Sequence, residues 1–330
     1  MNGYLHPEEV LYEGQRPFPS LPACEHYAGS EKLIRKALAL QAELGPIFDI
    51  TCDCEDGAAA GQEVAHAEMV ATLIMDSSNL FGRVGARIHS VHHAHWQADL
   101  EIIVSRAGSR LAYVVFPKPE SADDALTQIA YLNDVRKHYG IERQIPAHVL
   151  IETHGALREA WQIAALPHVE SIDFGLMDFV SAHNGAIPSS AMTSPGQFEH
   201  PLVVRAKAEI AAAALGNSVV PSHNVTTELR NPDVVREDAR RARNEFGFLR
   251  MWSIHPSQIQ PIVEAMRPEL DAVSDATAIL IAAQNAHWGP IQWNGRLHDR
   301  ASYRYFWGLL QRARVTGMTL PADALTRFFH

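Results

Sequence analysis

Ionisable side chains recur in this 330-residue chain directly after short apolar segments. After FDIT (48–51) come Asp53, Glu55 and Asp56, and after HVLI (148–151) comes Glu152. Further polar residues follow other apolar segments, namely Arg87, His89, Lys118, Asp178, Ser222, His223 and His255. Because the carboxyl ends of parallel strands gather at one edge or face, we expect these side chains to form one active site.

Glu152 and Asp178 follow consecutive predicted strands. Two neighbouring carboxylates repel each other unless a proton or a cation lies between them. Oxygen ligands together with water suit Mg²⁺, with Mn²⁺ as an alternative. The pair therefore predicts a metal site, and salt bridges from these carboxylates to Arg87 or Lys118 are the competing interpretation.

The basic residues and one histidine suggest substrate binding. The planar guanidinium of Arg87 suits a substrate carboxylate, although an ion pair with Glu55 or Asp53 is the alternative. Lys118 in FPKPE is interpreted as an electrostatic partner in preference to a Schiff-base lysine. His154, two residues after Glu152, is placed to hold a proton.

The cysteines and the histidine-rich segment carry weaker signals. Three cysteines (Cys24, Cys52 and Cys54) do not form a disulfide framework, and Cys-x-Cys alone is a poor zinc site, so we expect buried thiols. The segment HSVHHAHW (89–96) is interpreted as a solvated loop in preference to a metal site.

Composition excludes several classes of protein. The hydrophobic fraction is 47%, which argues against disorder, and the net charge of −10 disfavours general nucleic-acid binding. The segment MNGYLHPEEV lacks the features of a signal peptide, and no apolar run approaches a membrane span. We therefore expect a cytoplasmic protein that binds neither nucleic acid nor membranes.

Strand-like and helix-like segments alternate along most of the chain. Strands are expected at 48–55, 84–90, 112–118, 148–153, 171–176, 218–223 and 249–255, with a first strand near 18–24. Helices are expected between them at 31–44, 121–140, 156–166 and 231–247. This alternation predicts an α/β fold, a (β/α)₈ TIM barrel, and an open doubly wound sheet is the rival. The chain lacks the GxGxxG turn of a dinucleotide-binding sheet.

Two domains are predicted, a barrel over residues 1–262 that carries the site and a C-terminal helical extension over 263–330. The long polar segment 179–200 is expected to be a loop over the site. The extension has helix-like runs at 272–287 and 301–316 and many aromatic residues. It is interpreted as a lid and oligomer contact, with an intramolecular core as the alternative reading of its aromatic residues.

Several motifs in order resemble the HpcH/HpaI aldolase/citrate lyase family, in particular its citrate lyase β-subunit and malyl-CoA lyase groups. The resembling segments are TCDCEDGAAAG (51–61), ARIHS (86–90), VVFPKPES (114–121), LIETHGALREAWQIAAL (150–166), IDFGLMDF (172–179) and WSIHPSQIQPI (252–262). A weaker match continues through WNGRLHD (293–299). Order and spacing agree over most of the predicted barrel.

The resemblance implies a barrel that binds Mg²⁺ through Glu152 and Asp178 and holds the substrate through Arg87. It places Glu55 and Asp56 beside the metal and its waters, as catalytic candidates. It also implies a trimer or hexamer of identical chains, in which Asp299 of a neighbouring subunit acts as acid and base. Asp53, Lys118 and His154 are further candidates for substrate binding.

The sequence departs from the family pattern where basic residues are usual. Gln62 or Glu63 stands at the position of a lysine, His66 at that of an arginine, and His89 at that of an asparagine. These positions face the end that holds the phosphates of CoA in relatives. The departures leave the use of CoA open.

The residues and the resemblance together predict a Mg²⁺-dependent carbon–carbon lyase that acts on a hydroxy acid or its CoA thioester. Small 2-oxo or hydroxy acids, and acetyl-CoA or another acyl-CoA, are the expected ligands. Two alternatives stay open: a class II 2-oxo acid aldolase without CoA, and a degenerate barrel that binds a metabolite or a partner subunit. A barrel enzyme of phosphoryl transfer lacks an evident phosphate loop.

Overall fold

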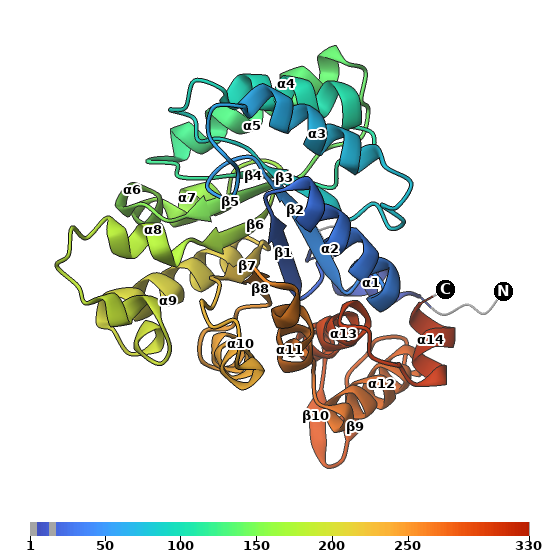
Figure 1. The fold of residues 1–330 in the computed structure, drawn as a ribbon. Coiled ribbons are helices and arrows are strands. Elements are labelled where there is room, and N and C mark those ends of the chain that lie inside the picture. The colour runs from blue at the N-terminus through green and yellow to red at the C-terminus, as the bar shows by residue number, and fades with distance from the viewer. Residues whose placement is uncertain (1–4, 13–17, 330) are drawn as a thin grey trace. The chain divides into compact units, whose positions relative to one another are not determined.

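The computed structural model describes residues 5–12 and 18–329 (Figure 1). The chain divides into two compact units, one of residues 22–265 and one of residues 1–21 together with 266–330. The predicted boundary at residue 262 lies close to this division. The N-terminal segment differs from the prediction, because it belongs to the same unit as the C-terminal residues and not to the barrel unit.

Residues 22–265 form a closed barrel of eight parallel strands in sequence order, as predicted (Figure 1). The strands are β1 (Cys24–Ala28), β2 (Phe48–Asp53), β3 (Val84–Arg87), β4 (Val114–Phe116), β5 (Ala147–Ile151), β6 (Val169–Phe174), β7 (Val220–His223) and β8 (Arg250–Ser253). Strand β8 pairs with β1 and closes the barrel. The carboxyl ends of all eight strands therefore meet at one face, where the site residues were expected.

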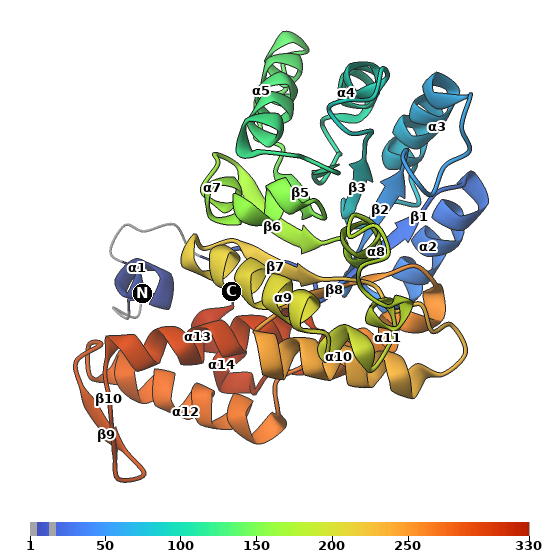
Figure 2. The ribbon, with the colours of Figure 1, turned by 90° about the vertical axis from the view of Figure 1, so that its left-hand side faces the viewer.

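Helices follow each strand and surround the barrel. They are α2 (Glu31–Leu44), α3 (Glu63–Met75), α4 (Trp96–Ala107), α5 (Ala122–His138), α6 (His154–Arg158), α7 (Ala160–Ala164), α8 (Leu176–Ser181), α9 (Pro201–Gly216), α10 (Pro232–Phe246) and α11 (Pro256–Met266). Figure 2 shows α3, α4 and α5 next to one another outside the strands. Helix α2 begins where Ser30 accepts a hydrogen bond from the backbone of Leu33, and it buries Ile34, Ala37 and Leu38.

Three predicted elements differ from the structure. The first strand is 24–28 and not 18–24, because Pro19 and Pro22 have no N–H to donate to a central strand. The predicted helix at 156–166 is divided into α6 and α7 at Glu159. The segment 179–200 is not a uniform loop, since it contains the end of α8 and two 3₁₀ turns, Ser189–Met192 and Gly196–Phe198.

The second unit has a hydrophobic core of its own. It contains α1 (Pro7–Leu11), α12 (Leu270–Asn285), α13 (Arg300–Val315), α14 (Ala322–Phe328) and a hairpin of β9 (Ile291–Trp293) and β10 (Arg296–His298). Trp288, Tyr303 and Trp307 are buried in this core, so these three aromatic side chains pack within the chain. The hairpin was not predicted, although Asn294 and Gly295, both at positive φ, are typical of its turn. Among the described residues, no helix is long and apolar enough to cross a membrane.

The interior of the barrel contains charged side chains near the amino ends of its strands. Arg250, at the start of β8, donates to Asp49 of β2 (2.6 Å) and to Glu25 of β1 (3.0 Å). Arg250 and Glu25 are completely buried. His148 of β5 lies 3.9 Å from Glu25 and 3.5 Å from Glu170. These groups balance one another's charge inside the barrel, a role that the sequence analysis did not identify.

Candidate active site

The turn after β2 is held together by Asp53. Its Oδ1 accepts hydrogen bonds from Nε of Arg87 and from the backbone of Glu55, and its Oδ2 accepts from Nη2 of Arg87 and the backbone of Gly57. A Cβ at Gly57 would lie 2.3 Å from Oδ2, so only glycine allows this close approach. Both oxygens of Asp53 are therefore engaged within the protein. This carboxylate orients Arg87 and the turn, and its contact with substrate stays a prediction.

Arg87, the last residue of β3, is buried and fixed in orientation. Its two parallel hydrogen bonds to Asp53 are 2.8 and 2.5 Å long, and Nη1 lies 3.3 Å from Oε2 of Glu55. Burial disfavours the charged forms of both partners, but the pairing outweighs it, lowering the pKa of Asp53 and raising that of Arg87. The ion pairs with Asp53 and Glu55 that were considered as an alternative to substrate binding are thus present.

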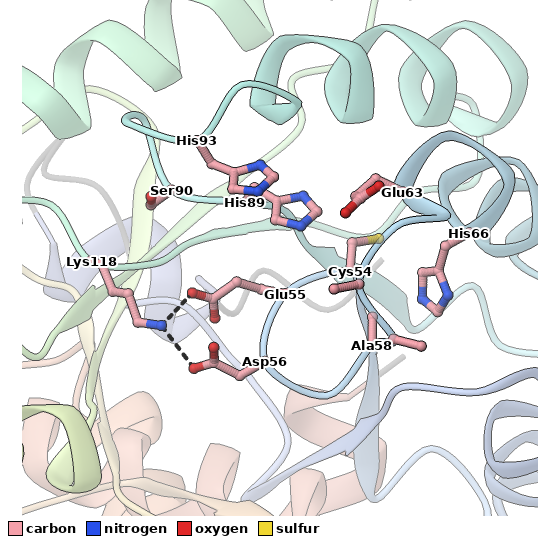
Figure 3. A pocket seen from close by; sticks show the side chains of 12 residues that line it. Cys54, Glu55, Asp56, Ala58, Glu63, His66, His89, Ser90, His93 and Lys118 are labelled. Carbon is pink, nitrogen blue, oxygen red and sulfur yellow. Dashed lines mark hydrogen bonds and ion pairs between the residues drawn. The ribbon is translucent and has the colours of Figure 1, made fainter.

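Lys118 connects three carboxylates at the mouth of the barrel. Its Nζ donates to Oε1 of Glu55 (2.5 Å) and to Oδ2 of Asp56 (2.8 Å), as Figure 3 shows. It also lies 3.8 Å from Oδ1 of Asp178. Burial opposes the charged form, but the hydrogen bonds to Asp56 and Glu55 raise the pKa of the ammonium group. A lysine that stays protonated is a poor nucleophile, so the geometry favours an electrostatic partner over a Schiff-base lysine.

Glu152 and Asp178 follow two neighbouring strands of the barrel, β5 and β6. Glu152 is 2% exposed and accepts one hydrogen bond, from the backbone N–H of Lys118 (2.8 Å). Burial, followed by the charge of Asp178, raises the pKa of Glu152 to about 8. Asp178 lies in the first turn of α8, with its side chain 43% exposed. A buried carboxylate and a half-exposed one thus share a region where negative charge is not fully compensated.

This pair fits a divalent cation. A Cβ at Gly175 would lie 2.2 Å from Oε2 of Glu152, so the glycine leaves the carboxylate the room it needs. Mg²⁺ is commonly held by one or two carboxylates and completes its coordination with water and substrate oxygens. The donor types and the uncompensated charge of Glu152 suit that ion.

A cavity of about 350 Å³ opens beside Glu55, Asp56 and Lys118. It is lined by the turn after β2, by Lys118, and by Glu63, His66, Ser90, His89 and His93 (Figure 3). The interpretation of 89–95 as a solvated loop is therefore wrong for His89 and His93, whose rings stack 4.0 Å apart in the cavity wall. It holds for His92, whose side chain is 63% exposed. Position 89 lies two residues after the end of β3, and this place near the carboxyl end of a strand was the signal in the sequence that His89 belongs to the site.

The remaining candidates lie elsewhere. His154 is exposed at the start of α6, where its ring contacts Phe179 and His183 of the α8 region and does not line the cavity. Asp299 belongs to the second unit, where it caps α13 by accepting hydrogen bonds from Ala301 and Ser302. The cysteines are free and buried, as expected, and Cys54 forms part of the cavity wall.

Comparison with known proteins identifies the family of the chain. The HpcH/HpaI aldolase/citrate lyase family model matches residues 38–256, well over half of the chain. The chain belongs to this family. Family members with related sequences include lyases that act on carbon–carbon bonds, so this chain is a member of a lyase family.

Relatives span nearly the whole chain. A crystal structure of a citrate lyase from Burkholderia xenovorans is 55% identical, with a TM-score of 0.85, and covers 98% of this chain and 100% of its own. An L-malyl-CoA/β-methylmalyl-CoA lyase from Cereibacter sphaeroides is 26% identical over 282 residues, which are 81% of this chain and 87% of the relative. The CitE protein of Mycobacterium tuberculosis in complex with magnesium, acetoacetate and coenzyme A shares the fold, at 22% identity and a TM-score of 0.65, over 89% of this chain and 99% of its own.

Proposed function

We propose that this protein is a Mg²⁺-dependent carbon–carbon lyase that cleaves or forms a hydroxy acid or its CoA thioester. The observation that carries the proposal is the buried Glu152 beside Asp178, with Arg87 and Lys118 at the same carboxyl-terminal face of the barrel. The magnesium complexes of the Mycobacterium tuberculosis relative and the lyase names of other relatives support it.

Glu152 and Asp178 would hold the metal, which when bound supplies Lewis-acid polarisation of a substrate carbonyl. Arg87 contributes a fixed positive charge, oriented by Asp53, for a substrate carboxylate. Lys118 holds Glu55 and Asp56 at the mouth of the site and offsets their charge. Burial raises the pKa of Glu55, and its Oε2 lies 3.3 Å from Nη1 of Arg87, so Glu55 borders the site as a catalytic candidate beside the metal.

A second candidate, a 2-oxo acid aldolase that does not use CoA, is favoured by the cavity wall. Glu55, Asp56 and Glu63 line the cavity, and Lys118 is the one lysine or arginine among the described residues that line it. Lys118 already binds two carboxylates. Such a wall repels the phosphates of CoA, whereas a small oxo acid needs only the metal and Arg87.

Calorimetry separates these candidates. We expect oxaloacetate or pyruvate to bind only when Mg²⁺ is present. Glu152→Gln should remove this binding. Glu120→Gln is the control, because Glu120 is exposed in the loop after β4, and this variant should bind as the unaltered protein does. Additional affinity for acetyl-CoA supports the thioester lyase, and its absence supports the free-acid aldolase. If the unaltered protein does not bind Mg²⁺, the result supports the third candidate, a degenerate barrel that binds a metabolite or a partner subunit.

We further propose a homo-oligomer, a trimer or hexamer, in which Asp299 serves the site of a neighbouring subunit. Asp299 directly follows the β9–β10 hairpin, whose Leu297 is 76% exposed. An exposed leucine on a short hairpin is suited to a contact between chains. Light scattering at several concentrations tests the number of subunits, and a monomer at all of them would contradict the proposal.

A further inference from the structure

His89 and Asp99 form a buried pair beside the site described above. Nδ1 of His89 donates to Oδ2 of Asp99 over 2.6 Å, and Asp99 on α4 is 1% exposed. His89 follows Arg87, the last residue of β3, by two positions, and its ring lines the cavity at the carboxyl-terminal face of the barrel.

The imidazole ring of His89 is held in a fixed orientation. Asp99 also accepts the backbone N–H of His89 (3.1 Å), and the carbonyl of His89 accepts from Nε2 of Gln128 on α5 (3.2 Å). The ring of His93 covers one face of His89 at a centroid distance of 4.0 Å and an interplanar angle of 11°. Neither rotation about the side chain nor movement of the backbone is free, so the position of the second nitrogen is fixed.

That second nitrogen, Nε2, is the group that can meet a ligand. Within the described part of the chain, Nε2 makes no hydrogen bond, while Nδ1 is occupied. The ring lines the same cavity as Glu55 and Lys118 (Figure 3). A histidine that only fills a core has both nitrogens satisfied by protein, whereas a carboxylate–histidine pair open at Nε2 is a common means of proton transfer.

We propose that His89 is a catalytic acid and base of this site, positioned by Asp99. The inference rests on the proposed lyase function and adds to it the residue that moves the proton. The substrate class is a hydroxy acid whose hydroxyl carbon is bonded to the α-carbon of an acetyl or pyruvyl group.

The proton and electron balance of the cleavage is as follows. Nε2 of neutral His89 takes the proton of the substrate hydroxyl, and the O–H electron pair forms the new C=O bond. The pair of the breaking C–C bond remains on the α-carbon as an enolate. Nε2–H then returns the proton to that carbon, which becomes a methyl group, and His89 is neutral again. No oxidant, reductant or further reactant is needed.

Deuterium uptake measures the second half of this cycle alone. The purified protein is incubated in D₂O with Mg²⁺ and either pyruvate or acetyl-CoA, and exchange of the methyl protons is followed by NMR. We expect exchange by the unaltered protein, and a loss of at least about 100-fold in His89→Gln, as is typical for a general acid or base. Affinity for the probe should stay within about threefold, because His89 is not placed to hold the metal.

His92→Gln is the matched control, because His92 lies in the same segment but is exposed and outside the cavity lining. It should exchange at the rate of the unaltered protein. Asp99→Asn tests the positioning role through the pH profile. It removes the charge that stabilises the imidazolium, so the ascending limb should move to lower pH. The other titratable groups near the rings of His89 and His93 are the same in the Asp99→Asn variant and in the unaltered protein. They are Glu55, Glu63, His93 and His95.

The outcomes are distinguishable. Exchange in the unaltered protein that His89→Gln retains overturns the role of His89 and leaves the proposed lyase intact. Absence of exchange with either probe in the unaltered protein overturns both. If His89→Gln does not fold, two other measurements test the role of His89. They are the exchange rate of His89→Asn and the NMR signals of the His89 ring in the unaltered protein. Those signals must shift when pyruvate is added with Mg²⁺, and signals that do not move contradict the assignment.

Discussion

The two ends of the barrel both contain buried charges, but they satisfy them differently. At the amino end, Arg250 lies between Glu25 and Asp49, and the charges are paired within the protein. At the carboxyl end, Glu152 is as deeply buried but accepts a single backbone hydrogen bond beside another carboxylate. A paired set of charges can stabilise a fold, whereas an unbalanced set indicates a place for a ligand.

Removing the central charge of the amino end should have the largest effect. Arg250→Met leaves Glu25 and Asp49 buried without their partner, and we expect a loss of about 3–5 kcal/mol in the free energy of unfolding. Denaturant titration measures this loss. Arg236→Met, which breaks a surface pair with Asp233, should cost no more than about 1 kcal/mol. Equal losses in the two variants would contradict the assigned role of Arg250.

The carboxyl end should respond in activity and not in stability. Glu152→Gln and Asp178→Asn should each lower Mg²⁺-dependent turnover by more than about 100-fold, since even outer-shell partners of a metal cost 10–100-fold. Without metal, Glu152→Gln should melt at the same or a higher temperature, because it removes a buried carboxylate. Chelation of the metal should inactivate the unaltered protein. Full activity in either variant would remove the basis of the metal site.

The amino end should contribute to the pH dependence of stability above pH 6.5. Burial opposes protonation of His148, but Glu170 and Glu25 outweigh it and raise its pKa to about 9. A raised pKa stabilises the fold below the unfolded value of about 6.5, and this stabilisation is lost as the pH rises through 9. We expect a loss of about 3 kcal/mol between these values. His148→Gln should make this part of the profile less steep, and a slope that the substitution leaves unchanged would exclude His148 as a source.

A partial recovery of activity in mixtures of two inactive variants should show whether a second chain contributes a residue to the site at the carboxyl end. Asp299→Asn and Glu152→Gln are each expected to be inactive, the first because it alters the side chain donated by the neighbouring chain and the second because it alters the metal site. When both are unfolded and refolded together, mixed oligomers regain a fraction of the activity, because some sites combine unaltered residues. An assay of the mixture detects this recovery. Mixtures that stay inactive would contradict the role proposed for Asp299.

The barrel was predictable from the sequence because its strands and helices carry local signals. The helix at 31–44 begins at Ser30 and ends before Gly45, and the structure has the same bounds. The first strand was misplaced because the apolar residues of 18–24 resemble a strand, although Pro19 and Pro22 within it cannot donate backbone hydrogen bonds. The hairpin of β9 and β10 was missed because its strands have three residues each and show no periodic pattern.

The site was predictable only in part. Glu152 and Asp178 are close because the carboxyl ends of neighbouring strands must meet, which follows from the fold alone. The engagement of both oxygens of Asp53 depends on the path of a turn of four residues, and spacing does not determine it. The pairing of His89 with Asp99 joins a strand end to a helix ten residues later, and a cluster of histidines conceals it.

The membership of α1 in the second unit has a consequence for the order of folding during synthesis. Leu11 belongs to the core formed by α12, α13 and α14, and His6 hydrogen-bonds to the carbonyl of Phe328 (3.0 Å). Domains fold as their residues leave the ribosome. The barrel residues 22–265 are complete while the first helix still lacks its partners. The N-terminal helix α1 can therefore dock only after the C-terminal helices have been synthesised and have folded.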